Sequence, residues 1–175
     1  QPGSMTPGAA QALLKGHGVL AGQKVVVAGT GPFLLPVATG LAQAGANVVG
    51  LYEAHSPLRW LLSPKALLLN ISKFGQLIYY ARLLRQYSLT PQFGRVVSRF
   101  DQGRVTISRV NSSFAQKDLK SKTVEAVVVA VGWGFLPDLT LGGISGCKQR
   151  VDSDGTAVFT VDANQLSSQP NIWIA

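Results

Sequence analysis

The chain has 175 residues and a hydrophobic content of 46%, which suffices for one domain with a buried core and excludes an intrinsically disordered chain. Its single cysteine, Cys147, excludes an internal disulfide, a redox-active cysteine pair and a cysteine-based metal site within this chain. The net charge of +8 comes from scattered basic residues. This distribution indicates a solvated surface that could face an acidic partner subunit, and argues against nucleic-acid binding.

No apolar run is long enough for a transmembrane segment, and no signal peptide is visible at Gln1, so a cytoplasmic protein is expected. The chain opens with a Pro- and Gly-rich extended stretch, followed by a short predicted helix from Ala9 to Lys15. We therefore expect residues 1–22 to form a lead-in to the domain that follows.

The next segment predicts a strand, a glycine turn and a helix. Val25 to Ala28 form a continuous apolar run, as expected for a parallel strand buried on both faces. Gly29 and Gly31 follow at once, where the chain must turn tightly and let its backbone approach a pyrophosphate. The predicted helix runs from Phe33 to Ala44 and is ended by Gly45. Strand, turn and helix in this order are typical of a dinucleotide-binding βαβ unit.

A second predicted strand, Asn47 to Tyr52, leads to the acid of this unit, Glu53. An acid at this spacing can accept hydrogen bonds from an adenosine ribose, and its charge disfavours a 2′-phosphate. The unit therefore favours NAD(H) over NADP(H). His55 and Arg59 follow, and either cationic side chain could stack on adenine or reach a phosphate, although surface polarity at a helix start explains them as well.

Three residues depart from the dinucleotide pattern. Leu34 replaces the third glycine of G-x-G-x-x-G and is expected to push the helix outward. Pro32 and Pro36 contribute no N–H groups to a phosphate. These departures leave a second interpretation open, in which the turn is structural and the chain is an interaction module with a degenerate nucleotide site.

From Pro57 to Gln86 apolar and aromatic residues recur at helical spacing, which is more often a core or subunit interface than a cofactor site. From Leu89 the period changes to two. Gln92 to Phe100, Arg104 to Val110 and a return near Phe114 to Gln116 predict a three-stranded antiparallel meander.

Val124 to Val131 is again a continuous apolar strand, and it ends in a loop that contains Gly132, Gly134 and Pro137. This loop is expected to line the nucleotide crevice. The sequence thus predicts an α/β fold: a Rossmann-like ββα sandwich with a central parallel sheet, helices on one face and the meander on the other.

The last segment predicts a hairpin, with Val151 to Ser153 and Ala157 to Val161 on either side of a turn at Asp154 and Gly155. Asn171 to Ala175 reads as the beginning of another buried strand. Because a domain rarely ends in mid-strand, we expect the chain to be a fragment of a longer protein.

This order of elements resembles the two-dinucleotide-domain flavoproteins of the pyridine nucleotide-disulfide oxidoreductase class. The phrase VEAVVVAVGWGFLPD resembles the closing strand of their NAD(P)-binding domain, with an A-x-G-x-x-P type loop at Ala130, Gly132 and Pro137. The phrases GAAQALLKGHGVLAGQKVVVAGTGPFLLPVA and DSDGTAVFTVDANQ are similar to the FAD-dependent subunits of opine oxidase, hydrogen cyanide synthase and amino-acid dehydrogenase complexes.

The resemblance implies a domain order: residues 1–22 lead in from an FAD-binding domain, residues 23–135 form an NAD(P)-binding-like domain, and residues 136–175 return towards the FAD-binding domain. It implies electron transfer beside a partner oxidoreductase subunit that oxidises the amine. FAD is expected in the full-length protein, and NAD(H) or another adenine nucleotide in this domain. No catalytic residue and no metal ligand is assigned. The candidate cofactor-binding residues are Gly29, Thr30, Gly31, Pro32, Phe33, Glu53, Arg59, Gly132 and Pro137.

Overall fold

The computed structural model describes residues 1–56, 71–116 and 121–174. The chain divides into two compact units, Gln1–Gly134 and Phe135–Ala175, which are described separately. Arg59 and the first half of the apolar stripe predicted from Pro57 lie outside the described residues. Within the described ranges, no helix combines the length and apolarity that crossing a membrane requires.

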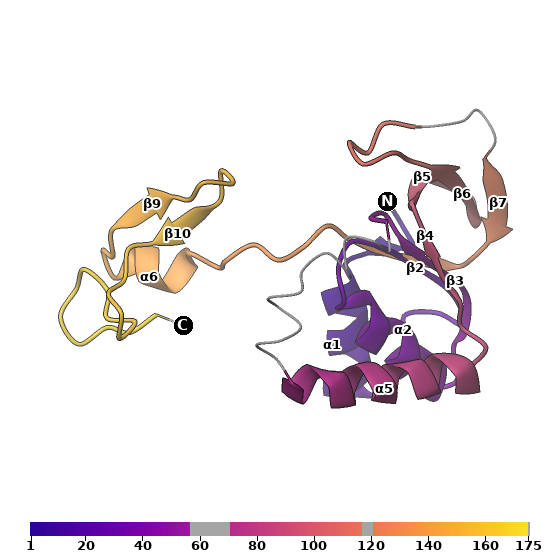
Figure 1. The fold of residues 1–175 in the computed structure, drawn as a ribbon, viewed down its shortest axis with the longest axis horizontal. Helices are drawn as coiled ribbons and strands as arrows, with labels where there is room; N and C mark the ends of the chain where they lie inside the picture. Colours follow the sequence, from indigo (N-terminus) through magenta and orange to yellow (C-terminus); the bar gives the residue numbers. More distant parts are fainter. Residues whose placement is uncertain (57–70, 117–120, 175) are drawn as a thin grey trace. The chain divides into compact units, whose positions relative to one another are not determined.

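A parallel sheet of five strands forms the centre of the first unit (Figure 1). Its order is β1-β8-β2-β3-β4, and each neighbouring pair is parallel. The strands predicted at Val25 to Ala28 and Asn47 to Tyr52 lie side by side in this sheet, together with the second half of the strand predicted at Val124 to Val131. The strands are β1 (Ser4–Met5), β2 (Lys24–Gly29), β3 (Asn47–Glu53), β4 (Pro91–Phe93) and β8 (Val128–Gly132).

The central strand β2 is buried on both faces, as its unbroken apolar sequence predicts. Val25 and Val27 pack into a core with the helices. Val26 and Ala28 point the other way and pack against the antiparallel sheet. Figure 1 shows the helices and the antiparallel sheet on opposite sides of the parallel sheet. The predicted ββα arrangement is therefore confirmed.

Within the described residues, three helices cover one face: α1 (Pro7–His17), α2 (Leu34–Gln43) and α5 (Ile71–Gln86). The side chain of Thr6 caps α1 by accepting a hydrogen bond from the Ala9 N–H at 3.1 Å. Gly45, just beyond α2, has a φ of 93°, so the predicted left-handed end of that helix is confirmed. Residues 1–22 are part of this unit, since β1 pairs with β8 and Ala10 of α1 is fully buried.

The antiparallel sheet consists of β5 (Arg95–Asp101), β6 (Arg104–Arg109) and β7 (Lys122–Glu125). The strand from Arg104 to Val110 was predicted correctly. The strand predicted from Gln92 to Phe100 is divided, because Gln92 and Phe93 belong to β4 of the parallel sheet and β5 begins only at Arg95. The third strand was placed too early. Near Phe114 to Gln116 the structure has an isolated bridge between Gln116 and Val110, and the strand that pairs with β6 is β7.

The apolar run from Val124 to Val131 is two strands in two different sheets, and its prediction as a single strand was wrong. The Ala126 N–H donates to the carbonyl of Gly103 in the antiparallel layer, at 2.9 Å. The next N–H, of Val127, donates to the carbonyl of Lys24 in the parallel sheet, at 2.8 Å. The chain thus changes sheets within one residue, and both halves are apolar because both contribute to the shared core.

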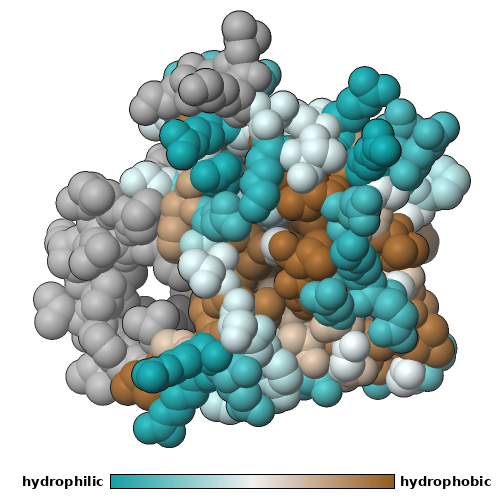
Figure 2. Space-filling view, turned by 90° about the vertical axis from the view of Figure 1, so that its right-hand side faces the viewer, coloured by the Kyte–Doolittle hydropathy of each residue, from teal (hydrophilic) through white to brown (hydrophobic). Residues whose placement is uncertain are grey.

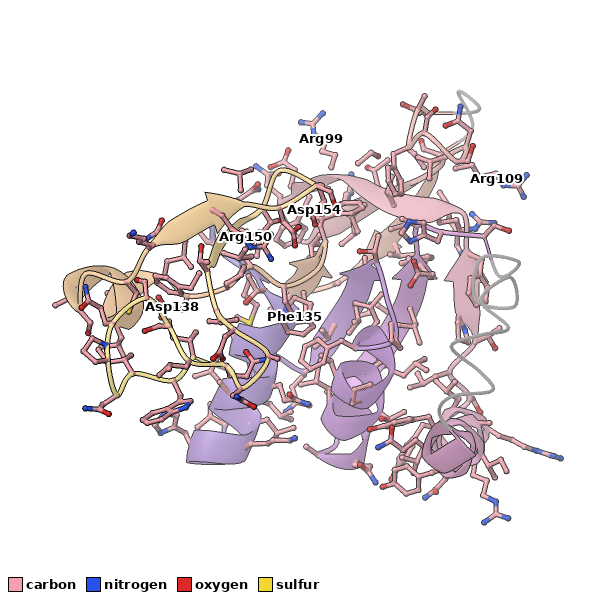
Figure 3. All side chains as sticks on the ribbon, turned by 60° about the vertical axis from the view of Figure 1, so that its left-hand side comes forward. Arg99, Arg109, Phe135, Asp138, Arg150 and Asp154 are labelled. Atoms are coloured by element: carbon pink, nitrogen blue, oxygen red, sulfur yellow. The ribbon has the colours of Figure 1, made fainter. Side chains whose placement is uncertain are left out.

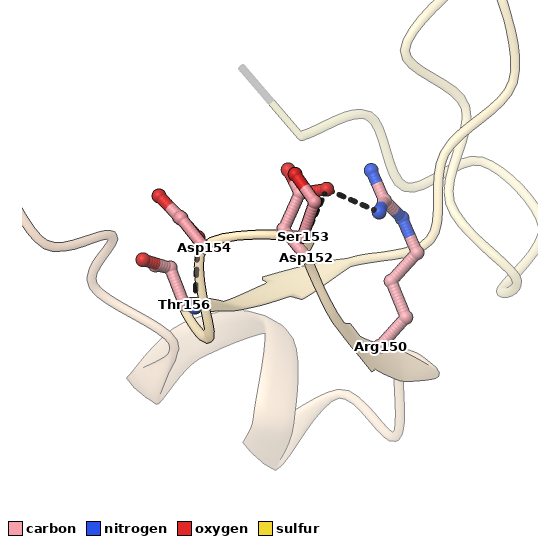
Figure 4. Close-up of polar contacts among 5 residues, drawn as sticks. All are labelled: Arg150, Asp152, Ser153, Asp154 and Thr156. Carbon is pink, nitrogen blue, oxygen red and sulfur yellow. Dashed lines mark hydrogen bonds and ion pairs between the residues drawn. The ribbon is translucent and has the colours of Figure 1, made fainter.

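The second unit contains the short helix α6 (Thr140–Ile144) and a hairpin of β9 (Gln149–Val151) and β10 (Ala157–Phe159). Figure 4 shows the turn of this hairpin, where side chains fix the backbone. Asp154 Oδ1 accepts the N–H of Thr156 at 2.9 Å, and Arg150 pairs with Asp152 at 3.1 Å. The hairpin predicted across Asp154 and Gly155 is therefore confirmed.

The buried strand predicted from Asn171 is not found in the described residues up to 174. Trp173 makes an isolated bridge with Leu166, and its side chain is 61% exposed. The apolar sequence of this segment therefore does not enter a sheet core within the second unit.

Basic side chains are spread over the first unit. Figure 3 shows Arg99 and Arg109 projecting outward from the antiparallel sheet, and Arg99 pairs with Asp101 at 3.1 Å. The face in Figure 2 carries hydrophilic side chains with hydrophobic surface between them. Arg99 and Arg109 lie apart from each other on this sheet, as the scattered basic residues of the sequence predicted.

Candidate functional site

The glycine turn after β2 is shaped by close backbone contact with β8. Gly29 is the register partner of Gly132, and its φ is 140°. A Cβ added to Gly29 would collide with the Gly132 carbonyl group. That carbonyl also accepts the N–H of Thr30 at 2.9 Å. Only glycine fits at position 29, because the backbone conformation and the space both exclude a side chain.

Glu53 holds the glycine turn from the other side. It ends β3 in register with Gly29 and is only 3% exposed. Its Oε2 accepts the N–H of Gly31 at 2.8 Å, and its Oε1 accepts the N–H of His55 at 3.0 Å. The Nδ1 of His55 lies 3.3 Å from Oε1. The acid predicted from spacing alone therefore reaches the turn and fixes it through charge-assisted hydrogen bonds.

The helix that follows begins with an apolar residue buried beneath the turn. Leu34 is the first residue of α2, and its side chain is 3% exposed within the core between helices and sheet. The preceding N-cap residue, Phe33, makes no side-chain capping hydrogen bond. The departure from the third glycine is thus accommodated by burying the leucine.

An apolar cavity of about 120 Å³ opens beside Glu53 and Gly31. It lies among α2, α5 and the ends of β3 and β4, and Tyr80 and Phe93 contribute aromatic rings to its wall. A Cβ on Gly31 would meet nothing within 4 Å, so the backbone there is open to a ligand. The complete lining is Gly31, Leu34, Leu35, Leu51, Glu53, Tyr80, Ala81, Leu84, Pro91 and Phe93.

The residues fit the base and ribose of a nucleotide better than its pyrophosphate. The cavity is apolar, and Glu53 stands at its edge as a hydrogen-bond acceptor. The amides of Thr30 and Gly31 already donate within the protein, to Gly132 and Glu53. Those of Leu34 and Leu35 donate to carbonyls of the turn. A phosphate over the turn would have to share or displace these bonds.

Most of the predicted cofactor-binding residues lie together at the carboxyl edge of the sheet, where ligands bind in doubly wound folds. The sequence segment from Gly29 to Phe33 forms the turn, and Glu53 and Gly132 end the strands on either side. Arg59 lies outside the described residues. Pro137 belongs to the second unit, where it lines a separate cavity of about 300 Å³.

Sequence reasoning missed an aromatic cluster at this same edge. The ring of Phe114 contacts His55, with centroids 5.2 Å apart, and Trp133, with centroids 6.1 Å apart. The position of Trp133 between two glycines was a weak sequence signal for a residue at the ligand-binding edge. The sequence around Phe114 gave no such signal, because Phe114 lies in the loop between β6 and β7 and only the fold brings it to the sheet edge.

Cys147 is buried, and its Sγ lies 3.4 Å from the hydroxyl oxygen of Ser167. This environment is that of a small packed residue. Across residues 1–56, 71–116 and 121–174, no three His, Cys, Asp or Glu side chains converge as metal ligands would.

Solved structures define the class of this fold. The flavoprotein disulfide reductase RclA from Escherichia coli matches with a TM-score of 0.57 and 18% identity, over 99% of this chain and 33% of that one. Thioredoxin reductase from T. acidophilum matches with a TM-score of 0.55 and 16% identity, over 98% of this chain and 48% of that one. The chain therefore has the fold seen in parts of these two reductases. No family model matches the chain.

Curated relatives are more specific. The HcnB subunit of hydrogen cyanide synthase from Pseudomonas aeruginosa is 30% identical over 178 residues, which cover 99% of this chain and 38% of the relative. An opine oxidase subunit from Agrobacterium tumefaciens is 27% identical over 190 residues, covering 99% of this chain and 34% of the relative. The chain is thus homologous to these oxidoreductase subunits and spans little more than a third of their length. The resemblance inferred from the sequence is confirmed.

Proposed function

We propose that this chain is the nucleotide-binding segment of a flavin-dependent oxidoreductase subunit that carries electrons in amino-acid or opine-type amine oxidation. The observation that carries this proposal is the apolar cavity of about 120 Å³ that opens beside Gly31 and Glu53. It lies where the glycine turn meets the terminal acid of a βαβ unit. Homology to subunits of hydrogen cyanide synthase and opine oxidase supports the redox assignment.

The nucleotide proposed for this domain is NAD(H) or another adenine nucleotide, while FAD would belong to the full-length protein. The backbone from Gly29 to Phe33 would approach the phosphates, and Gly132 would border them. The Oε2 atom of Glu53 accepts the Gly31 N–H and has a second lone pair, which could accept a ribose hydroxyl. A bound nicotinamide would supply hydride chemistry, and the protein would supply position and electrostatics. The buried charge of Glu53 would repel a 2′-phosphate.

We propose a nucleotide-binding-like domain at residues 23–135 and a return segment at 136–175. The boundary between the two compact units, after Gly134, supports the second division, while residues 1–22 belong to the first unit. Three apolar side chains of the second unit are largely exposed: Leu136 at 84%, Leu141 at 79% and Ile144 at 80%. We propose that these residues belong to an interaction surface. We expect the remainder of the full-length subunit, or its partner oxidoreductase subunit, to cover it.

The second candidate function is a structural or interaction module whose dinucleotide site is degenerate. The observation that favours it is the engagement of the turn's amides: Gly31 donates to Glu53, Thr30 donates to Gly132, and Pro32 has no N–H. In this alternative the Glu53 carboxylate occupies the amide that a bound phosphate would otherwise accept from. Its negative charge also repels a phosphate group.

A calorimetric titration of the chain with NADH, NADPH and ATP separates these candidates. The proposed function predicts saturable NADH binding and weaker NADPH binding. Glu53→Lys should narrow or invert that preference, and Glu53→Gln should narrow it with less disturbance of the fold. Glu125→Lys is the matched charge reversal, because Glu125 is an exposed acid in an antiparallel strand. No binding of any nucleotide would favour the structural module.

A further inference from the structure

Three aromatic rings from separate segments meet at the carboxyl edge of the parallel sheet. His55 follows β3, Phe114 lies between β6 and β7, and Trp133 follows β8. Phe114 meets both neighbours edge to face, with interplanar angles of 68° to His55 and 74° to Trp133. Edge-to-face packing is favourable for aromatic pairs, and it leaves ring faces available for a further partner.

The two hydrocarbon-rich rings of the cluster are exposed to solvent. Phe114 is 44% exposed and Trp133 is 56% exposed. Phe114 also has a φ of 59°, a left-handed conformation that is a genuine outlier for a bulky residue. Strain of this kind is concentrated at functional sites.

A neighbouring side chain holds Phe114 in this conformation. The Oδ1 atom of Asn111 accepts the N–H of Ser113 at 3.0 Å and the N–H of Ala115 at 3.0 Å. The Ala115 carbonyl in turn accepts the N–H of Asn111 at 3.0 Å. The turn is therefore built around Phe114, and it presents the ring against Trp133.

The cluster borders the glycine turn. Trp133 is bonded to Gly132, the register partner of Gly29, and His55 donates its backbone N–H to Glu53. An indole beside a nucleotide turn offers a large, polarisable face, and planar nitrogen heterocycles stack on such faces.

We propose that the indole of Trp133, braced by Phe114, is the platform on which a planar heteroaromatic ring of a bound nucleotide stacks. This inference rests on the proposed function and extends it by assigning the surface for a ring. Adenine, nicotinamide and flavin share the required chemistry. Asn111 is a positioning residue, because it acts through the conformation of Phe114.

The test is a titration of the full chain with each of four ligands, in which tryptophan fluorescence and calorimetry measure binding. ATP carries adenine, nicotinamide mononucleotide carries nicotinamide, flavin mononucleotide carries flavin, and NADH carries two of these rings. Stacking quenches indole emission, so the ligand that quenches it identifies the ring. Trp133→Ala should lower the affinity for that ligand by roughly 5- to 100-fold, the range expected for loss of one aromatic stacking partner. Trp133→Phe should retain most of the affinity.

Trp173→Phe is the matched control, because Trp173 is an equally exposed tryptophan of the second unit. It should leave both affinity and ligand-induced quenching unchanged. Asn111→Ala should reduce the quenching amplitude at saturating ligand, an effect that a merely structural role would not produce. Thermal melting confirms that each variant is folded.

Nucleotide binding that is equally tight in Trp133→Ala, with no ligand-induced quenching in the wild-type chain, would overturn the platform and leave the proposed function standing. If no ligand binds the wild-type chain, both proposals are contradicted. If quenching is lost in Trp173→Phe instead, the ring binds elsewhere and the platform is also overturned.

Discussion

Gly29 and Gly132 are register partners in adjacent parallel strands, and their backbones approach so closely that a side chain at position 29 would collide with the Gly132 carbonyl group. This contact creates the narrow carboxyl edge at which the turn begins. Glycine is required here by space and by the φ of 140° at position 29.

Gly29→Ala should therefore destabilise the chain by about 3 kcal/mol or more, since the new methyl group meets backbone and the conformation is unsuitable for alanine. Gly40→Ala is the matched control. Gly40 lies inside α2 with open space around it, so alanine there should stabilise by about 0.5–1 kcal/mol. Urea unfolding of both variants measures the difference. Equal stability of the two would show that the strands can separate at the turn.

Removing the Glu53 carboxylate should destabilise the fold as well as the site. Glu53→Ala leaves the half-buried N–H groups of Gly31 and His55 without their acceptor. The cost is at most about 1–3 kcal/mol for each group, the value for a donor that water cannot reach. Glu53→Gln keeps one carbonyl oxygen and should lose about half as much. Glu125→Ala, which breaks an exposed ion pair, should change the unfolding free energy by less than about 1 kcal/mol. A Glu53→Ala variant as stable as Glu125→Ala would mean that the turn does not depend on the carboxylate.

Leu34 distinguishes a working site from a degenerate one. Leu34→Gly removes a buried side chain from the core, so the unfolding free energy should fall by about 3–5 kcal/mol. If the nucleotide is accommodated around the leucine, its affinity should fall too. Leu34→Ala should lower the unfolding free energy and the nucleotide affinity in the same direction, by smaller amounts. Tighter nucleotide binding by Leu34→Gly, despite lower stability, would instead mean that the leucine obstructs the site.

Tyr52 should make stability fall at high pH. Its ring is fully buried beside Gly50, and its hydroxyl group has no hydrogen-bond partner among the described residues. Burial raises the pKa of Tyr52, and this effect outweighs the lowering by Arg95. Above the ordinary tyrosine pKa of about 10, the unfolded chain loses this proton while the folded chain keeps it, so folding becomes less favourable as pH rises.

Tyr52→Phe removes that titration and should flatten the fall in unfolding free energy above pH of about 10. At neutral pH the variant should be as stable as the wild type or slightly more stable, because the lost hydroxyl had no partner among the described residues. Denaturant unfolding across pH measures both effects. An unchanged alkaline slope would assign the pH dependence to other tyrosines or lysines.

The local pattern of the sequence was sufficient to predict β2, the glycine turn, α2 and the acid at the end of β3. These features follow from apolar periodicity and from the conformations that only glycine adopts. The sequence could not show where the chain changes sheets between Ala126 and Val127, because both neighbouring strands are apolar and only their hydrogen-bond partners differ.

For the site, too, the sequence predicted individual residues but not the contacts between them. Spacing placed Glu53 near the turn, but its bond to the Gly31 amide depends on the register between β2 and β3. The cluster of His55, Phe114 and Trp133 joins residues far apart in the chain. No local pattern encodes that meeting, because it depends on how the antiparallel sheet packs over the parallel one.

The most direct measurement of the central claim is the amide NMR spectrum of the chain during titration with NADH. The account predicts that the Gly31 resonance moves saturably, together with those of Gly29 and Thr30, because the ligand binds over the turn and alters the Gly31–Glu53 hydrogen bond. NADPH should produce the same shifts only at higher concentration. A Gly31 resonance that stays fixed at NADH concentrations sufficient to saturate related reductases would contradict a nucleotide site at this turn.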